Sequence, residues 1–204
     1  MKLYTYQLSP LQTNCYVLVN ENTNSAVAID IGGDEGFLLL EELKRGFKIE
    51  TVLLTHAHFD HVGGVYKFYE RGAKVYLSIN DSDAVTNGDL NLSTVFGSQV
   101  KPFEVNKLFG GEILDVSGFK IEVINTPGHT KGGITYKFGD MLFCGDTVFL
   151  GSFGRVDFPG GDIKTLKKSI EKLFNFSGCT LYPGHGEKTL VDDEKNTNPI
   201  RYYD

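Results

Sequence analysis

The sequence predicts an α/β protein in which helices cover β-sheets, and three observations carry this prediction. Short apolar runs rich in β-branched residues recur along the chain, as they do in buried strands. Segments with apolar residues at helical spacing alternate with these runs. Some strand-like runs follow one another directly, as the strands of hairpins do, so the order is not that of a regular doubly wound sheet.

The strand-like runs are short and are separated by loops that contain glycine. We expect strands at Cys15–Val19, Ala26–Ile31, Val52–Thr55, Val75–Leu77, Phe119–Asn125, Ile134–Phe138 and Met141–Cys144. Most of the 24 glycines are ordinary loop residues, but several lie beside the histidines, where they permit tight turns and close approach of the backbone.

Three segments are predicted to be helices: Asp34–Arg45, Val62–Arg71 and Asp162–Phe174. The first two are followed directly by a glycine, which favours the end of a helix. The third begins with an aspartate that is suited to cap the helix N-terminus. The first segment has four leucines at helical spacing: Leu38, Leu39, Leu40 and Leu43.

Length and composition limit the class of protein. The 204 residues suit a single domain, which we expect to span residues 1–204. The formal net charge of −6 and the absence of a Lys/Arg-rich run argue against nucleic acid as a partner. Because the chain shows neither a signal-peptide pattern nor an apolar run of membrane-spanning length, we expect a cytoplasmic protein without membrane association. The three cysteines, Cys15, Cys144 and Cys179, are expected to be small buried residues and not disulfides.

One short motif concentrates metal-binding side chains. The segment His56-Ala57-His58-Phe59-Asp60-His61 places three imidazoles and a carboxylate within six residues, directly after the apolar run that ends at Leu54. Nitrogen and carboxylate donors of this kind suit zinc, iron or manganese. Packing so many titratable groups together is unfavourable without a cation that neutralises them. The motif therefore predicts a metal site at the end of a strand.

The other histidines lie in similar settings. His129, Asp146 and His185 each follow a strand-like run and a proline or glycine. Each alone is more typical of a solvated or turn residue. Together with the first motif, however, they use all five histidines of the chain, and loops at strand ends bring such side chains to one point.

The order of these residues resembles the metallo-β-lactamase superfamily. The His-x-His-x-Asp-His motif is followed by His129, Asp146 and His185 in the family's order. The segments 13–16 and 28–30 resemble the family's opening strands, and Asn198-Pro199 resembles its closing segment. The resemblance implies an αββα four-layer sandwich with the metals in a cleft at one edge of the two sheets.

The resemblance also implies the ligands. His56, His58 and His129 would hold one metal, Asp60, His61 and His185 a second, and Asp146 would bridge them. Two divalent ions are expected, with zinc as the first choice and iron or manganese as the alternatives. The nucleophile would be a hydroxide between the metals, so Asp60 and Asp146 are expected to be catalytic residues as well as ligands.

Within the superfamily, residues 145–149 and 151–158 most resemble the short form of the glyoxalase II-like hydrolases. A thioesterase of the hydroxyacylglutathione hydrolase type, acting on a small-molecule thioester, is therefore the first expectation. Full-length glyoxalase II enzymes have a helical extension that holds glutathione and tend to have tyrosine where this chain has Asp157, so the way glutathione would bind is open. The best-known metallo-β-lactamases usually carry arginine in place of His61.

Other functions fit parts of the same pattern. A persulfide dioxygenase would use His56, His129 and Asp146 for one iron, and a lactonase would use the hydrolytic site on another carbonyl compound. A non-enzymatic metal-binding module is disfavoured because the ligand count leaves metal positions open. The oligomeric state is not predicted.

Three further residues have two interpretations each. Arg155 either binds a substrate carboxylate or pairs with Asp157. Asp30 either orients a ligand histidine or is a turn residue before Gly32. Tyr182, close to His185, is expected to pack and not to take part in catalysis.

Overall fold

Two mixed six-stranded sheets form the centre of the molecule, and the computed structural model describes residues 1–203. The first sheet has the order β1-β2-β3-β4-β5-β6, with strands Lys2–Leu8, Thr13–Val19, Ser25–Ile29, Lys48–Leu53, Lys74–Ser78 and Asn106–Leu108. The second has the order β14-β13-β10-β9-β8-β7. Its strands in chain order, β7 to β10 followed by β13 and β14, are Ile113–Val116, Phe119–Asn125, Ile134–Phe138, Met141–Gly145, Thr180–Pro183 and Thr189–Leu190. A small ribbon of β11 and β12, Val148–Phe149 and Ser152–Phe153, lies apart from both.

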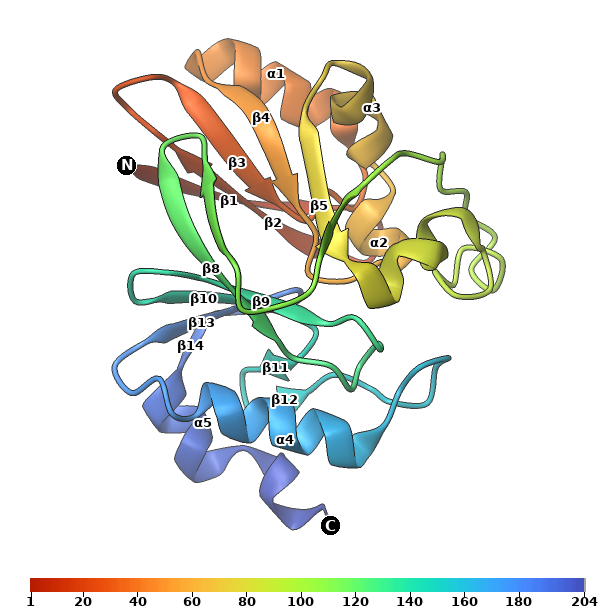
Figure 1. Cartoon of the computed structure of the whole chain (residues 1–204), viewed down its shortest axis with the longest axis vertical. Coiled ribbons are helices and arrows are strands. Elements are labelled where there is room, and N and C mark those ends of the chain that lie inside the picture. The colour runs from red at the N-terminus through yellow and green to blue at the C-terminus, as the bar shows by residue number, and fades with distance from the viewer. Residues whose placement is uncertain (204) are drawn as a thin grey trace.

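The helices form the two outer layers. Figure 1 shows α1 (Glu35–Arg45) and α3 (Val65–Glu70) above the first sheet, and α4 (Ile163–Leu173) and α5 (Val191–Thr197) below the second. The short helix α2 (Phe59–Val62) and two 3₁₀ helices, Ile79–Thr86 and Pro199–Tyr202, complete the chain. The αββα sandwich implied by the family resemblance is confirmed.

Strand β2 shows why the sheets are covered on both faces. All seven of its residues are buried. Successive side chains of a strand point to opposite faces. Cys15 and Val17 accordingly belong to the core under α1 and α3, whereas Tyr16 and Leu18 belong to the core between the sheets. A third core lies between the second sheet and α4 and α5, so each contact between layers has its own apolar cluster.

Most of the predicted elements are confirmed, with ends that shift by a few residues. Asp162 caps α4 as predicted, because its side chain accepts a hydrogen bond from the Thr165 amide at 2.7 Å. Gly46 ends α1 in the left-handed conformation. The three cysteines are buried and unpaired. Tyr182 packs against Tyr16 and Phe143 as expected.

The predicted helix 62–71 is wrong in its limits. Helix α2 begins three residues earlier, at Phe59, and the chain then turns through Gly63 and Gly64 before α3. Glycine is required at this turn because the backbone that follows β3 lies too close to leave room for a side chain. A Cβ at Gly63 would lie only 2.7 Å from the carbonyl oxygen of Gly32. The break between α2 and α3 therefore depends on the close approach of two backbone segments, and the helical periodicity of the sequence does not indicate it.

Other elements lay outside the sequence predictions. Strands β1, β6, β7, β13 and β14 and helix α5 are short or lack the β-branched runs used to find strands. The leucines of α1 are not one buried stripe, since Leu38 is buried but Leu40 and Leu43 are 64% and 81% exposed. Among residues 1–203, no helix combines the length and apolar character needed to cross a membrane.

The sheets bring five strand ends to one edge. Strands β3 and β4 run parallel in the first sheet. In the second sheet β10 and β13 run parallel, and β8 shares their direction because both β8 and β10 are antiparallel to β9. The segments that follow these strands therefore emerge on the same side, and they contain Asp30, His56–His61, His129, Asp146 and His185.

Candidate metal centre

All seven predicted metal ligands lie together at this edge. Their donor atoms form three overlapping groups, within each of which every pair of atoms is no more than 4.8 Å apart. The groups are His56 with His58 and His129, His56 with His61 and Asp146, and Asp60 with His61 and His185. The residues come from both sheets, so the tertiary fold assembles the cluster.

The first group consists of three imidazole nitrogens that face one another. Nδ1 of His58 lies 3.0 Å from Nε2 of His56 and 3.0 Å from Nε2 of His129. A ring nitrogen has either one proton or one lone pair, so Nδ1 of His58 cannot form good hydrogen bonds in both directions at once. Tetrahedral zinc at 2.0–2.1 Å from each nitrogen would separate them by about 3.3 Å, close to this arrangement.

The second group combines nitrogen and oxygen donors. Oδ2 of Asp60 lies 3.2 Å from Nε2 of His185 and 3.6 Å from Nε2 of His61. Asp60 and His61 are neighbours on α2, so the early start of this helix points both side chains to the same place.

Asp146 lies between the two groups. Its Oδ2 is 3.6 Å from Nε2 of His129 in the first group and 3.7 Å from Nε2 of His185 in the second. Its Oδ1 is 3.4 Å from Nε2 of His61. One carboxylate therefore faces nitrogen donors of both groups.

Contacts on the far side of the rings orient the ligand nitrogens. Asp30 lies 2.9 Å from Nδ1 of His61, and it also accepts hydrogen bonds from the amide and hydroxyl of Thr55. The Thr55 hydroxyl lies 3.1 Å from Nδ1 of His56. Since that hydroxyl donates to Asp30, it accepts the Nδ1 proton of His56, which leaves the Nε2 lone pair for the cluster. Asp30 thus contacts a histidine that is predicted to be a ligand, in agreement with one of its two interpretations.

Backbone carbonyls orient two other rings in the same way. Nδ1 of His129 lies 2.6 Å from the carbonyl oxygen of Arg155, and Nδ1 of His185 lies 3.2 Å from that of Leu11. Because a carbonyl only accepts, each Nδ1 carries the proton and each Nε2 offers its lone pair to the cluster.

Two residues that contribute to the site were not predicted as site residues. The Thr13 hydroxyl donates a hydrogen bond of 3.0 Å to Oδ2 of Asp60. The buried carboxylate of Asp81 accepts hydrogen bonds of 2.7 Å from the Thr130 hydroxyl and from the Gly132 amide. Asp81 therefore holds the loop of His129. A lone aspartate 49 residues from its partner leaves no local sequence signal.

Unsatisfied polar atoms test whether a metal fits this cluster. Among residues 1–203, Nε2 of His58, Nε2 of His61 and Oδ1 of Asp146 are buried without a hydrogen-bond partner. A buried polar atom without a partner is costly, and orphaned groups are rare in folded proteins. For His61 and Asp146, the unsatisfied atoms are donor atoms of the cluster. The cluster is thus incomplete by itself and fits a bound cation.

Charge in the cluster is divided unevenly. Burial, together with repulsion from His129, lowers the pKa of His58 to about 3. Burial and the neighbouring His61 lower the pKa of His56 as well. Burial opposes the charge on His61 too, but the carboxylates of Asp60 and Asp146 outweigh it and raise its pKa. His56 and His58 are therefore neutral, which is the form of imidazole that binds metals, whereas the carboxylates of Asp60 and Asp146 strongly attract positive charge.

Glycine at two positions leaves room for the ligands. A Cβ at Gly184 would lie 2.1 Å from Oδ1 of Asp146 and 2.6 Å from Cε1 of His61. A Cβ at Gly154 would lie 1.8 Å from the carbonyl oxygen of Asp146. The glycines beside the ligand residues are thus required by close packing at these two positions.

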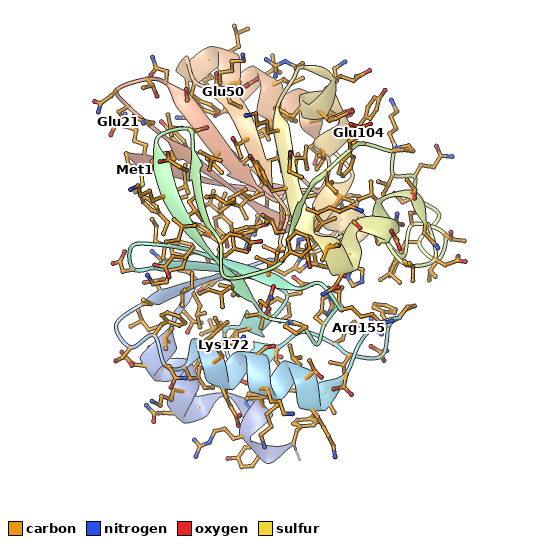
Figure 2. All side chains as sticks on the ribbon, in the orientation of Figure 1. Met1, Glu21, Glu50, Glu104, Arg155 and Lys172 are labelled. Atoms are coloured by element: carbon orange, nitrogen blue, oxygen red, sulfur yellow. The ribbon has the colours of Figure 1, made fainter. Side chains whose placement is uncertain are left out.

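A cleft of about 490 Å³ opens onto the cluster. Ligand residues from both groups line it, together with several phenylalanines and Arg155. Figure 2 labels Arg155, which belongs to the loop between β12 and α4. Its Nε donates to Oδ1 of Asp157 at 2.6 Å and its Nη2 donates to Oδ2 at 2.5 Å. The structure thus shows the ion pair that the sequence allowed, and substrate binding by Arg155 stays a prediction.

The fold and the cluster define the class of protein. The sequence model of the metallo-β-lactamase superfamily matches residues 8–185 of this chain. This span includes all seven predicted ligands. The chain belongs to this superfamily, as its motifs predicted.

Two proteins similar to this chain are a probable metallo-hydrolase and a hydroxyacylglutathione hydrolase. The chain is 35% identical to the probable metallo-hydrolase YqgX of Bacillus subtilis, over 98% of this chain and 97% of that protein. It is 34% identical to the hydroxyacylglutathione hydrolase GloC of Haemophilus influenzae, over 98% of each. These relatives support an enzymatic function.

Solved structures agree with the fold over almost the full chain. The BLEG-1 B3 metallo-β-lactamase superimposes with a TM-score of 0.92 at 33% identity, over 98% of this chain and 99% of that one. TTHA1623 in a di-iron-bound form superimposes with a TM-score of 0.88 at 34% identity, over 97% and 99%. Together with the donor cluster, the family and the di-iron-bound form of TTHA1623 support divalent metals at this site.

Proposed function

We propose that the protein is a two-metal hydrolase that cleaves thioesters. The observation that carries the proposal is the position of Asp146, whose Oδ2 is 3.6 Å from Nε2 of His129 and 3.7 Å from Nε2 of His185. A carboxylate that faces nitrogen donors of both groups suits a bridge between two cations.

The ligand assignment follows the two groups. His56, His58 and His129 would hold the first ion, Asp60, His61 and His185 the second, and Asp146 both. Zinc is the first choice, because histidine and aspartate are ligands that it prefers in catalytic sites. Iron and manganese accept the same donors. The di-iron-bound form of TTHA1623 supports iron as an alternative.

The chemistry at this site needs no nucleophile from the protein. Two divalent ions, when bound, would supply Lewis acidity and lower the pKa of water toward about 7, which suits hydrolysis of a carbonyl compound at neutral pH. Cys144 is buried near the cluster, but burial raises the pKa of its thiol to about 12. It is therefore protonated and inert. Thr13 holds Asp60 toward His185 through the hydrogen bond to Oδ2.

Thioesters are proposed because of the relatives and the motifs. The similarity to GloC over the whole chain supports a hydroxyacyl thioester as substrate. A lactone presents a comparable carbonyl, so lactonase activity is the alternative that the same assay tests. The B3 metallo-β-lactamase BLEG-1 makes a β-lactam the third compound to include.

The second donor group argues against the dioxygenase alternative. A single iron held by His56, His129 and Asp146 would leave the other donors, Asp60 and those around it, without a role. Yet Asp60, His61 and His185 converge within 4.8 Å of one another. A purely structural metal module is also disfavoured, because a cleft of about 490 Å³ opens onto the donors.

Metal analysis combined with an activity assay tests the proposal. Protein reconstituted with zinc, iron or manganese is expected to hold two ions per chain and to hydrolyse lactoylglutathione, and a chelator should abolish the activity. Asp146→Ala should lose both the metal and the activity. Asp140→Ala removes an exposed aspartate directly before β10, the strand that precedes Asp146. This variant should lose neither the metal nor the activity.

Two outcomes would overturn the proposal. One is a firm value of one ion per chain, with Asp60→Ala and His185→Ala fully active. The other is oxygen consumption with glutathione persulfide and no hydrolysis of any thioester, lactone or β-lactam. Together they would assign the protein to the mononuclear iron dioxygenases.

A further inference from the structure

Three phenylalanines form a continuous aromatic surface beside the metal centre. The rings of Phe59 and Phe96 stack with centroids 5.0 Å apart. Phe96 meets Phe158 edge to face at 6.4 Å, and Phe158 meets the ring of His58 edge to face at 6.1 Å. We call Phe59, Phe96 and Phe158 the aromatic wall. All three line the cleft, and the wall ends at a proposed metal ligand.

The aromatic wall is partly in water. Phe96 is 48% exposed. It belongs to the segment 87–105, which has turns and bends but neither helix nor strand. Leaving an aromatic ring in water forgoes the free energy of burying its surface. Long segments of this kind in compact domains are commonly binding loops. The position of Phe96 at a cleft therefore suits an apolar ligand that covers it.

Other apolar side chains line the same cleft. They are Leu11, Phe149 and Phe153. Phe149 meets His185, a proposed ligand of the second metal, edge to face at 6.2 Å. Hydrocarbon surface thus lies beside proposed ligands of both metals. The cleft volume of about 490 Å³ lies in the range of small-molecule sites.

Among the described residues that line the cleft, no cationic side chain is free to bind an anionic substrate group, so only the proposed metals would attract one. Among residues 1–203, Arg155 is the only lysine or arginine that lines this cleft. Its guanidinium is engaged by both carboxylate oxygens of Asp157 and lies 4.0 Å from the ring centroid of Phe158. A substrate carboxylate would have to displace Asp157 from a bidentate pair. The remaining charged residues that line the cleft are the aspartates proposed as ligands.

We infer that the physiological substrate carries an aromatic or similarly bulky apolar group beside the carbonyl that is cleaved, and that the aromatic wall binds this group. The inference rests on the proposed hydrolase function and names its substrate class. In the hydrolysis, the acyl carbon would gain the hydroxyl group of water, the C–S bond would break, and the leaving sulfur would gain the proton. A small polar lactoyl group would leave the wall in water.

Binding of two uncleavable ligands tests the inference without relying on turnover. S-Phenacylglutathione and S-acetonylglutathione are ketones that differ only in a phenyl or methyl group beside the carbonyl. The metal-loaded protein should bind the phenacyl compound about tenfold more tightly in titration calorimetry. Phe96→Ala should reduce that preference about fivefold. Phe109→Ala, which removes a phenylalanine that is 67% exposed and does not line the cleft, should leave it unchanged.

Kinetics separate failure of the inference from failure of the proposed function. S-Phenylacetylglutathione should have a kcat/KM about tenfold above that of lactoylglutathione, and Phe96→Ala should raise KM for the first compound only. Hydrolysis of lactoylglutathione with equal or higher kcat/KM, together with equal binding of the two ketones, would overturn the inference and leave the thioesterase proposal intact. If the protein hydrolyses neither thioester but still prefers the phenacyl ketone, the thioesterase proposal would be overturned. The inference that the aromatic wall binds an apolar group would then stand.

Discussion

Asp30 lies 2.9 Å from Nδ1 of His61, on the side of the imidazole ring opposite to Nε2, which faces Asp60 and Asp146. The carboxylate is buried and also accepts two hydrogen bonds from Thr55. This arrangement fixes the tautomer and the direction of the ring, as carboxylates behind metal-binding histidines do.

Replacement of Asp30 should therefore weaken one metal site and spare the other. In Asp30→Asn the affinity for the second ion is expected to fall about 10- to 100-fold, because the ring of His61 loses its anionic partner. Metal titration against a competing chelator measures both affinities. Asp34→Asn changes an exposed aspartate nearby and should alter neither. Unchanged affinity for both ions in Asp30→Asn would show that the contact does not orient the ligand.

Gly184→Ala should damage the site through contact alone. The added Cβ would lie 2.1 Å from Oδ1 of Asp146 and 2.6 Å from His61, so the proposed bridging carboxylate must move. We expect a loss of hydrolysis of about 100-fold or more with a stable fold, since a misplacement of about 1 Å can be that costly. Gly36→Ala places a methyl group where no atom lies within 4 Å and should remain active. Full activity of Gly184→Ala would contradict the close packing described here.

Substitution of Arg155 tests whether its side chain braces a loop or binds the substrate. Because Asp157 already engages its guanidinium, Arg155→Ala is expected to change KM less than twofold and to lower the melting temperature slightly. Asp157→Ala should lower the melting temperature by a similar amount. The substrate-binding role would be supported instead by a KM increase of about tenfold with unchanged melting. Steady-state kinetics and thermal melts of the two single variants decide between these results.

Asp81 is expected to act on the first metal through a loop. Its carboxylate accepts hydrogen bonds from Thr130 and Gly132, which follow His129 by one and three residues. In Asp81→Ala the affinity for the first metal should fall, whereas Asp81→Asn should retain most of that affinity. The amide oxygen can still accept from Gly132, and its nitrogen can donate to Thr130. Asp83→Ala, at an exposed neighbouring position, is the control for metal titrations. A failure of asparagine to rescue would point to the charge of Asp81 and not to its hydrogen bonds.

The sequence indicated the residues that lie together in the cluster, but it did not indicate the residues that support them. His56, His129 and Asp146 follow apolar runs that are visible as strands, and strands that end at one edge bring such residues together. Asp81 and Thr13 contact the site across 49 and 47 positions of the chain, and nothing in their immediate neighbours indicates those contacts. Long-range hydrogen bonds of this kind depend on the tertiary fold alone.

The same distinction applies to the fold. The buried β2 and the capped α4 have strong local patterns, and both were predicted. The break between α2 and α3 depends on how Gly63 meets Gly32, which lies in the loop between β3 and α1. The position of Arg155 was also open, because its choice between substrate and Asp157 depends on the course of one loop.

Each proposed metal would join segments from both halves of the sandwich. His58 and His129 meet across 71 positions of the chain, one following a strand of the first sheet and the other a strand of the second. An ion held by both is a reversible cross-link, and closing so long a loop is costly for the chain in its absence. The apolar core between the sheets also joins the halves, so metal uptake would add to that contact, and a higher free metal concentration would stabilise the docked halves further at this edge.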